Sequence, residues 1–125
     1  MVLIDEAVRS ILLANPAVYS MVGSRIYPIQ LPLECVFPAL SYLFPSDPFQ
    51  RVARGARLQV DCWAEDPEEC KNLKITVEKA LDGYAGIVNT VNIEGIFPIS
   101  PYDTAPDDSG VFHIPYDFKV IYRTM

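Results

Sequence analysis

The stretch RLQVDCWAEDPEECKNL, residues 57–73, gathers two cysteines, a tryptophan and several carboxylates, which are residue types common in active sites. A nucleophilic cysteine needs a neighbouring base, and the chain has one histidine, His113. No Cys-His family signature surrounds His113, so a surface histidine is the simpler interpretation. A zinc site made from His113 and the three cysteines has the right ligand count, but the short C-x₂₋₄-C pair is missing. The cysteines are Cys35, Cys62 and Cys70.

Two other kinds of site are weakly indicated. The pair Asp107-Asp108 has the residue types of a glycosidase or a metal site, but proline, serine and glycine flank it and favour a solvated turn. The segment DGYAGI lacks the G-x-G-x-x-G pattern of a dinucleotide site. We therefore expect no enzyme activity, no bound metal and no cofactor.

The composition describes a chain of 125 residues with net charge −6, half of it hydrophobic, which fits a single domain over residues 1–125. An acidic surface argues against wrapping a phosphate backbone, because that requires clustered Lys and Arg. No segment has the ~18 to 20 continuous apolar residues of a membrane span. The N-terminus lacks the basic region of a signal peptide, and an odd number of cysteines indicates reduced thiols in the cytoplasm.

The elements that must position these residues follow from periodicity. Helical spacing predicts a helix over 3–14, which Asn15-Pro16 ends, and then one short turn closed by Gly23. Strands are predicted at 25–29, 38–44 and 57–64, and a second long helix at 67–81. A strand region with a turn or bulge follows at 87–97. The last strand is predicted at 111–123, where apolar residues at even positions alternate with largely polar ones at odd positions. This order favours an α+β fold, a mostly antiparallel sheet with two main helices on one face.

These elements give the opening cluster a structural explanation. Asp66 has the position of a helix N-cap, with Glu69 three residues later as in a capping box. Asp61 falls on the polar side of the strand at 57–64. Trp63 falls on the same side, where a large aromatic residue is either covered by a loop or available to a partner.

Two long, turn-rich loops are predicted at 45–55 and 98–110, and long loops in compact domains tend to carry function. Arg51, Arg54 and Arg57 lie three residues apart at the first loop. Three such cations are able to bind a phosphate, but in an acidic chain they are better suited to the carboxylates of a neighbouring protein.

The order of several segments resembles the phage tail completion family, which is related to the tail terminator proteins of long-tailed phages. The segments are VRSILLANPAVYSMVGSRIYPIQLP, FPALSYLFPS, RLQVDCWAEDPEECKNLKITVEKALDG and FHIPYDFKVIY. LQVDCWAEDPEECKNL and VGSRIYP are the most specific of them. The resemblance covers nearly the whole chain, residues 2–122.

The resemblance implies a tail-terminator-like α+β protomer that forms a hexameric ring at the head-proximal end of the tail tube, or forms it only on the tube. Its implied partners are the tube protein, a head-completion or neck protein, and DNA that passes through the lumen without specific binding. The protein would assemble in the host cytoplasm and remain in the neck of the virion tail, or be encoded by a prophage. We expect no membrane partner.

Site residues are expected in two groups. The subunit interface would include Arg51, Arg54, Arg57 and Trp63. The acidic lumen or its loops would include Asp47, Asp103, Asp107 and Asp108. Another neck component, such as a head-closure or connector protein, and a stand-alone ferredoxin-like domain that binds a small ligand remain alternatives.

Overall fold

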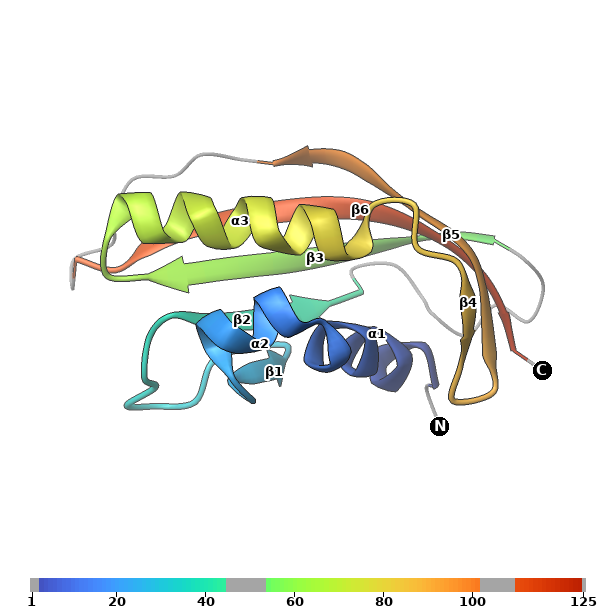
Figure 1. The fold of residues 1–125 in the computed structure, drawn as a ribbon, viewed down its shortest axis with the longest axis horizontal. Coiled ribbons are helices and arrows are strands. Elements are labelled where there is room, and N and C mark those ends of the chain that lie inside the picture. The colour runs from blue at the N-terminus through green and yellow to red at the C-terminus, as the bar shows by residue number, and fades with distance from the viewer. Residues whose placement is uncertain (1–2, 45–53, 102–109, 125) are drawn as a thin grey trace.

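The computed structural model describes residues 3–44, 54–101 and 110–124. Within these ranges six strands form one sheet in the order β1-β2-β3-β6-β5-β4, and the single parallel pair is β1 with β2 (Figure 1). This confirms the predicted α+β fold with a mostly antiparallel sheet. The elements are α1 (Leu3–Ala14), α2 (Pro16–Val22), β1 (Ile26–Pro28), β2 (Ala39–Leu43), β3 (Arg54–Ala64), α3 (Pro67–Leu81), β4 (Gly86–Val88), β5 (Val91–Pro101) and β6 (Phe112–Thr124).

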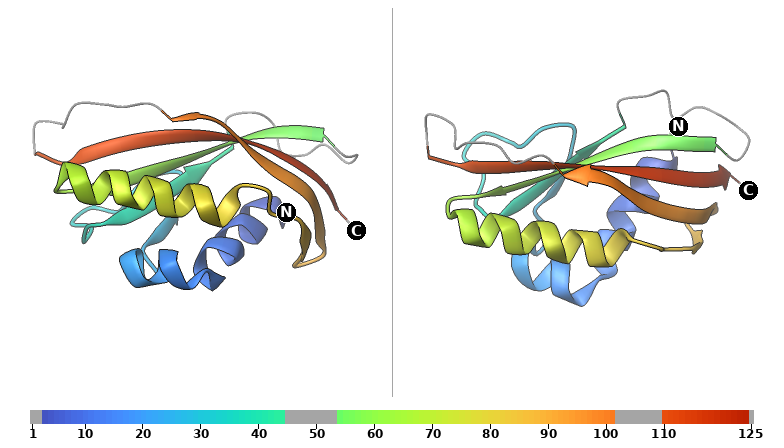
Figure 2. Two further views of the ribbon diagram at one scale, coloured as in Figure 1. Left: turned by 45° about the horizontal axis from the view of Figure 1, so that its top comes forward. Right: turned by 90° about the horizontal axis from the view of Figure 1, so that it is seen from above.

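The helices cover one face of the sheet (Figure 2). In α1 the predicted apolar stripe is buried, and the helix ends at Ala14, ahead of Pro16 as predicted. The stripe consists of Ile4, Ala7, Val8, Ile11 and Leu12. Within the described residues, no helix is long and apolar enough to span a membrane.

The segment after α1 is a third helix, α2, where the sequence predicted only a turn. The Asn15 side chain accepts hydrogen bonds from the backbone N–H groups of Ala17 and Val18, at 3.0 and 3.1 Å. Pro16 lies in the first turn of α2. Proline is tolerated there because the backbone N–H group that it lacks would have no partner within the helix. This capping stabilises a seven-residue helix that apolar periodicity alone does not reveal.

Helix α3 begins as predicted, because the Asp66 side chain accepts a hydrogen bond of 2.9 Å from the backbone N–H of Glu69. Its buried stripe packs in the core, together with the inner faces of β3 and β6. The α3 residues of the stripe are Cys70, Leu73, Val77, Ala80 and Leu81.

Strands β3 and β6 form the long centre of the sheet, paired from Arg54–Tyr122 to Ala64–Phe112. The predicted alternation of β6 is confirmed, because its aromatic and aliphatic residues at even positions from 114 to 122 are buried in the core. The odd positions, among them His113 and Lys119, face the side without helices. That outer face carries the polar residues of the candidate site.

Three boundaries differ from the sequence prediction. The region at 87–97 is two strands, β4 and β5, joined by a turn in which Asn89 and Thr90 have φ values of 50° and 66°. The expected bulge lies in β5, at a register shift between Ile93 and Gly95. Strand β5 continues to Pro101, and β3 begins at Arg54, so the ends of both predicted loops are strand because β6 pairs with them.

Candidate functional site

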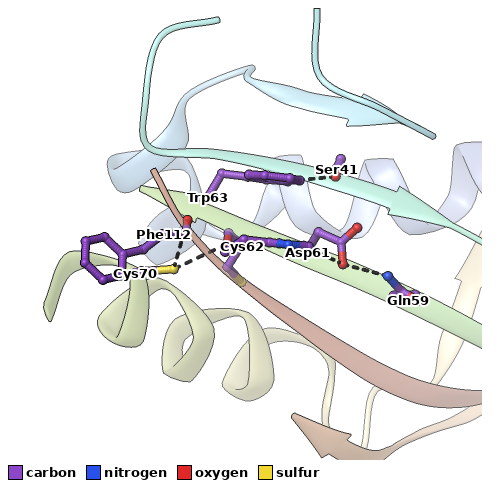
Figure 3. Close-up of polar contacts among 8 residues, drawn as sticks. Ser41, Gln59, Asp61, Cys62, Trp63, Cys70 and Phe112 are labelled. Atoms are coloured by element: carbon purple, nitrogen blue, oxygen red, sulfur yellow. Dashed lines mark hydrogen bonds and ion pairs between the residues drawn. The ribbon is translucent and has the colours of Figure 1, made fainter. Parts of the chain in front are cut away.

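The two cysteines of the opening cluster lie in the core. Cys62 and Cys70 are fully buried, and the Cys70 thiol donates a hydrogen bond of 3.3 Å to the Cys62 carbonyl oxygen (Figure 3). Burial raises the pKa of Cys70 to about 11 and raises the pKa of Cys62 well above its usual range. A thiol with so high a pKa remains protonated at neutral pH and is a poor nucleophile.

His113 lies on the outer face of the sheet, where its ring stacks on Trp63 with centroids 3.9 Å apart and an interplanar angle of 3°. Its Nε2 atom is 3.3 Å from Oδ1 of Asp61. Within the described residues, no group of three or more His, Cys, Asp or Glu side chains is arranged to bind a metal. The Cys₃His set considered from the sequence is therefore not brought together.

A hydrogen-bonded polar cluster surrounds Trp63 on this outer face. The indole Nε1–H of Trp63 donates to the Ser41 hydroxyl at 3.0 Å, and the Gln59 amide donates to Asp61 at 2.8 Å (Figure 3). Ser41 and Asp61 are buried, with exposed fractions of 1% and 5%. Trp63 is half-buried, so one part of its ring is fixed by this cluster and another part remains accessible.

The three arginines predicted for an interface have different surroundings. Arg57 forms an ion pair with Asp117, whose side chain is 3% exposed, while the Arg57 side chain is 51% exposed. Arg54 begins β3 opposite Tyr122, and Arg51 lies outside the described residues. The four acidic residues predicted for the lumen also lie outside them: Asp47, Asp103, Asp107 and Asp108.

An apolar hollow lies beside Trp63, with a volume of about 440 Å³. Segment 29–37, which connects β1 to β2, forms most of its wall, and Trp63 and Val111 form the rest. Three large apolar side chains of this segment face solvent: Ile29 is 71% exposed, Leu33 95% and Val36 64%. This segment has no role among the residues predicted from the sequence, although its concentration of Leu, Val and Phe in a connection between strands is a signal of one.

A second exposed apolar surface lies on β5. Phe97 and Ile99 are 47% and 53% exposed, and Phe97 pairs across the strands with Lys119 of β6. The Phe97 ring lies over Gly95, where an added Cβ would come within 2.7 Å of the ring Cζ atom. Glycine at position 95 therefore leaves room for the ring in this orientation.

Comparison with known structures shows that this fold occurs in another protein. A chain from the virion of a native gene transfer agent particle superposes with a TM-score of 0.75 and 17% sequence identity, covering 94% of this chain and 92% of that one. At this identity the likeness shows a shared fold. No curated protein sequence gives a match.

The family comparison covers almost the whole chain. The family model described as tail completion protein gp17 matches residues 6–123, which include all six strands except the last residue of β6, and both long helices apart from the first turn of α1. The resemblance inferred from the sequence is thereby confirmed. The chain belongs to the tail completion protein gp17 family and is a structural component of phage tails.

Proposed function

We propose that this protein is a tail terminator, or tail completion, subunit. Copies of it form a ring at the head-proximal end of the tail tube, stop tube polymerisation and join the tail to the head. The observation that carries this proposal is the family match over residues 6–123. The likeness to a chain of a gene transfer agent virion supports it, because it extends over nearly all of both chains.

The side-chain chemistry is consistent with a role that involves no catalysis. Cys62 and Cys70 are buried thiols with raised pKa values, which does not suit a nucleophile. His113 is engaged by Trp63 and Asp61, which are groups of the folded sheet itself. We therefore propose that the polar residues of the outer face stabilise the sheet and contact neighbouring proteins.

The negative net charge of the chain suits a ring through whose lumen DNA passes. The chain carries a charge of −6, so a ring of several copies would be strongly acidic. An acidic lumen repels the phosphate backbone and lets DNA slide without adhering. The residues proposed to line the lumen are Asp47, Asp103, Asp107 and Asp108. The other proposed partners are the tube protein and a neck protein of the head, met first in the host cytoplasm and then in the virion.

Charge reversal of two arginines tests the proposed contact surface. Arg51 and Arg54 lie at or beside the loop at 45–55, and their change to Glu should weaken tail joining while the monomer stays folded. Lys79→Glu, at an exposed position of α3, is the matched control. Tail length and head attachment would be counted by electron microscopy, with folding checked by circular dichroism. Normal tails joined to heads in the Arg51→Glu/Arg54→Glu double variant would contradict this assignment.

Two alternatives have distinct predictions. Another neck component, such as a head-closure or connector protein, would lie elsewhere in the particle, and electron microscopy of virions would locate it. A stand-alone domain that binds a small ligand is favoured by one observation, the 440 Å³ hollow beside Trp63, whose volume suits such ligands. That alternative predicts a monomer or dimer with saturable binding at Trp63 and no place in the virion.

A further inference from the structure

We infer that the hollow beside Trp63 is a docking site for β5 of a second copy of this chain. This inference rests on the proposed ring and names the surfaces by which neighbouring copies meet. The hollow surface consists of segment 29–37 and Trp63. The β5 surface consists of Phe97, Ile99 and Lys119.

Both surfaces expose large apolar side chains to solvent. Leu33 is 95% exposed and Ile29 71%, and on the other surface Phe97 is 47% exposed and Ile99 53%. Burying apolar area stabilises a contact by about 25 cal/mol per Å². Contiguous exposed apolar side chains of this size mark interaction sites more often than scattered ones do.

The two surfaces lie far apart across the strand order of the sheet. Segment 29–37 follows the edge strand β1, whereas β5 is four strand positions away, a separation of roughly 20 Å at the usual strand spacing. In Figure 1 the segment lies at the lower left and the end of β5 lies along the top. A contact between two different surfaces of the same chain is heterologous, and repetition of such a contact produces a closed ring when its rotation permits.

The shapes of the surfaces are complementary. The hollow is concave, apolar and wide enough for an aromatic side chain, with Trp63 and Phe37 in its wall. Phe97 supplies an aromatic ring that lies over Gly95 and keeps its other side open to solvent. Aromatic pairs of this kind are frequent at the centres of protein interfaces.

The charges beside the two surfaces are also complementary. Glu34 lines the hollow, and Lys119 is the cross-strand neighbour of Phe97. Both residues are exposed, and neither takes part in an ion pair between described residues. In a chain of net charge −6, a cation beside the protruding ring and a carboxylate beside the hollow favour the association of like copies. Because both halves of the contact are on this chain, the partner that fits is a second copy.

A charge-swap experiment on the purified full-length chain tests this contact. Glu34→Lys and Lys119→Glu each place like charges across the proposed interface, so each variant alone should self-associate at least about tenfold more weakly than the wild type. When the two variants are mixed, alternating copies restore opposite charges at every contact, and association should return. Sedimentation would be measured up to about 1 mM protein, where even weak contacts populate. Glu68→Lys and Lys79→Glu, both on α3, are the matched controls and should behave as the wild type.

Thiol labelling locates the contact independently of charge. Cys35 lines the hollow and is half-buried, whereas Cys62 and Cys70 are fully buried, so a maleimide should label Cys35 in the folded monomer. Association should protect Cys35 in the wild type, and Leu33→Ser should abolish that protection. Leu33 is almost entirely solvent-exposed, so this variant keeps the fold. Ile75→Ser on α3 is the apolar control.

Three results would overturn the inference. They are a wild type that stays monomeric at about 1 mM, single variants that associate as the wild type does, and a mixture that associates no better than its components. The proposed function would survive each of them, because the presence of a ring on the tail is judged in assembled particles. A protein that associates through these surfaces but is absent from the tail end would leave the contact valid and remove the proposed function.

Discussion

Replacing Arg57 with glutamine removes the cation that pairs with the Asp117 carboxylate on the outer face of the sheet. The Asp117 side chain is 3% exposed and cannot recover full hydration after the change. Loss of a hydrogen bond to a charged group costs about 1.5 to 3 kcal/mol when the remaining group is buried. Because Arg57 is half exposed, water screens the pair, and the expected loss is about 1 to 2 kcal/mol.

The assay is urea unfolding followed by the fluorescence of Trp63, the only tryptophan of the chain. In thermal unfolding followed by the same fluorescence, a loss of this size should lower the melting temperature by about 3 to 8 °C for a chain of this length. Lys119→Gln is the matched control, because Lys119 is the cross-strand neighbour of Arg57 and is exposed. It should change the free energy of unfolding by less than about 0.5 kcal/mol.

A double-mutant cycle separates the ion pair from other effects. Arg57→Gln combined with Asp117→Asn should cost less than the sum of the single changes, with a coupling energy of about 1 kcal/mol. The assignment of this ion pair would be refuted by two results together. The effects of the two single changes on the free energy of unfolding would be additive, and the Arg57→Gln variant would be as stable as Lys119→Gln. The stability of the fold would then give no reason against the interface role predicted for Arg57.

Two further predictions concern the thiols and the capping of α3. Cys70 has a pKa of about 11 in the folded protein against an ordinary 9.0, so the unfolded chain releases this proton at lower pH than the folded one. The free energy of unfolding should therefore be unaffected by Cys70 below pH 9 and fall between pH 9 and about 11. Urea unfolding at successive pH values checks this, and Cys70→Ala should reduce the fall; an unchanged pH profile in that variant would contradict the raised pKa. Asp66→Ala removes the N-cap bond to Glu69 and should cost about 1 kcal/mol, whereas Glu68→Ala should cost less than half as much. Equal stability of these two variants would exclude the capping role of Asp66.

The sequence predicted those parts of the fold that depend on local signals. Helix α1 combines a regular apolar stripe with a proline stop, and both of its ends were found. The capping residues of α3 and the alternation of β6 are equally local, and the structure confirms them. Helix α2 was missed because a side-chain cap, and not periodicity, stabilises its seven residues.

Contacts between residues distant in the sequence could not be predicted from local sequence patterns. Alternation placed Trp63 on the outer face, but its stacking on His113 depends on the register of β3 against β6. The pairing of Arg57 with Asp117, which are 60 residues apart, depends on the same register. The hollow needs segment 29–37 to fold beside Trp63, and only the assembled sheet fixes that position.

The most direct test of the proposed function is the particle population formed when this protein is absent. A phage or prophage with the coding sequence deleted should accumulate filled heads and separate, overlong tail tubes, and the wild-type protein supplied in trans should restore joined tails of normal length. Joined tails of normal length in the deletion strain would contradict the proposed function.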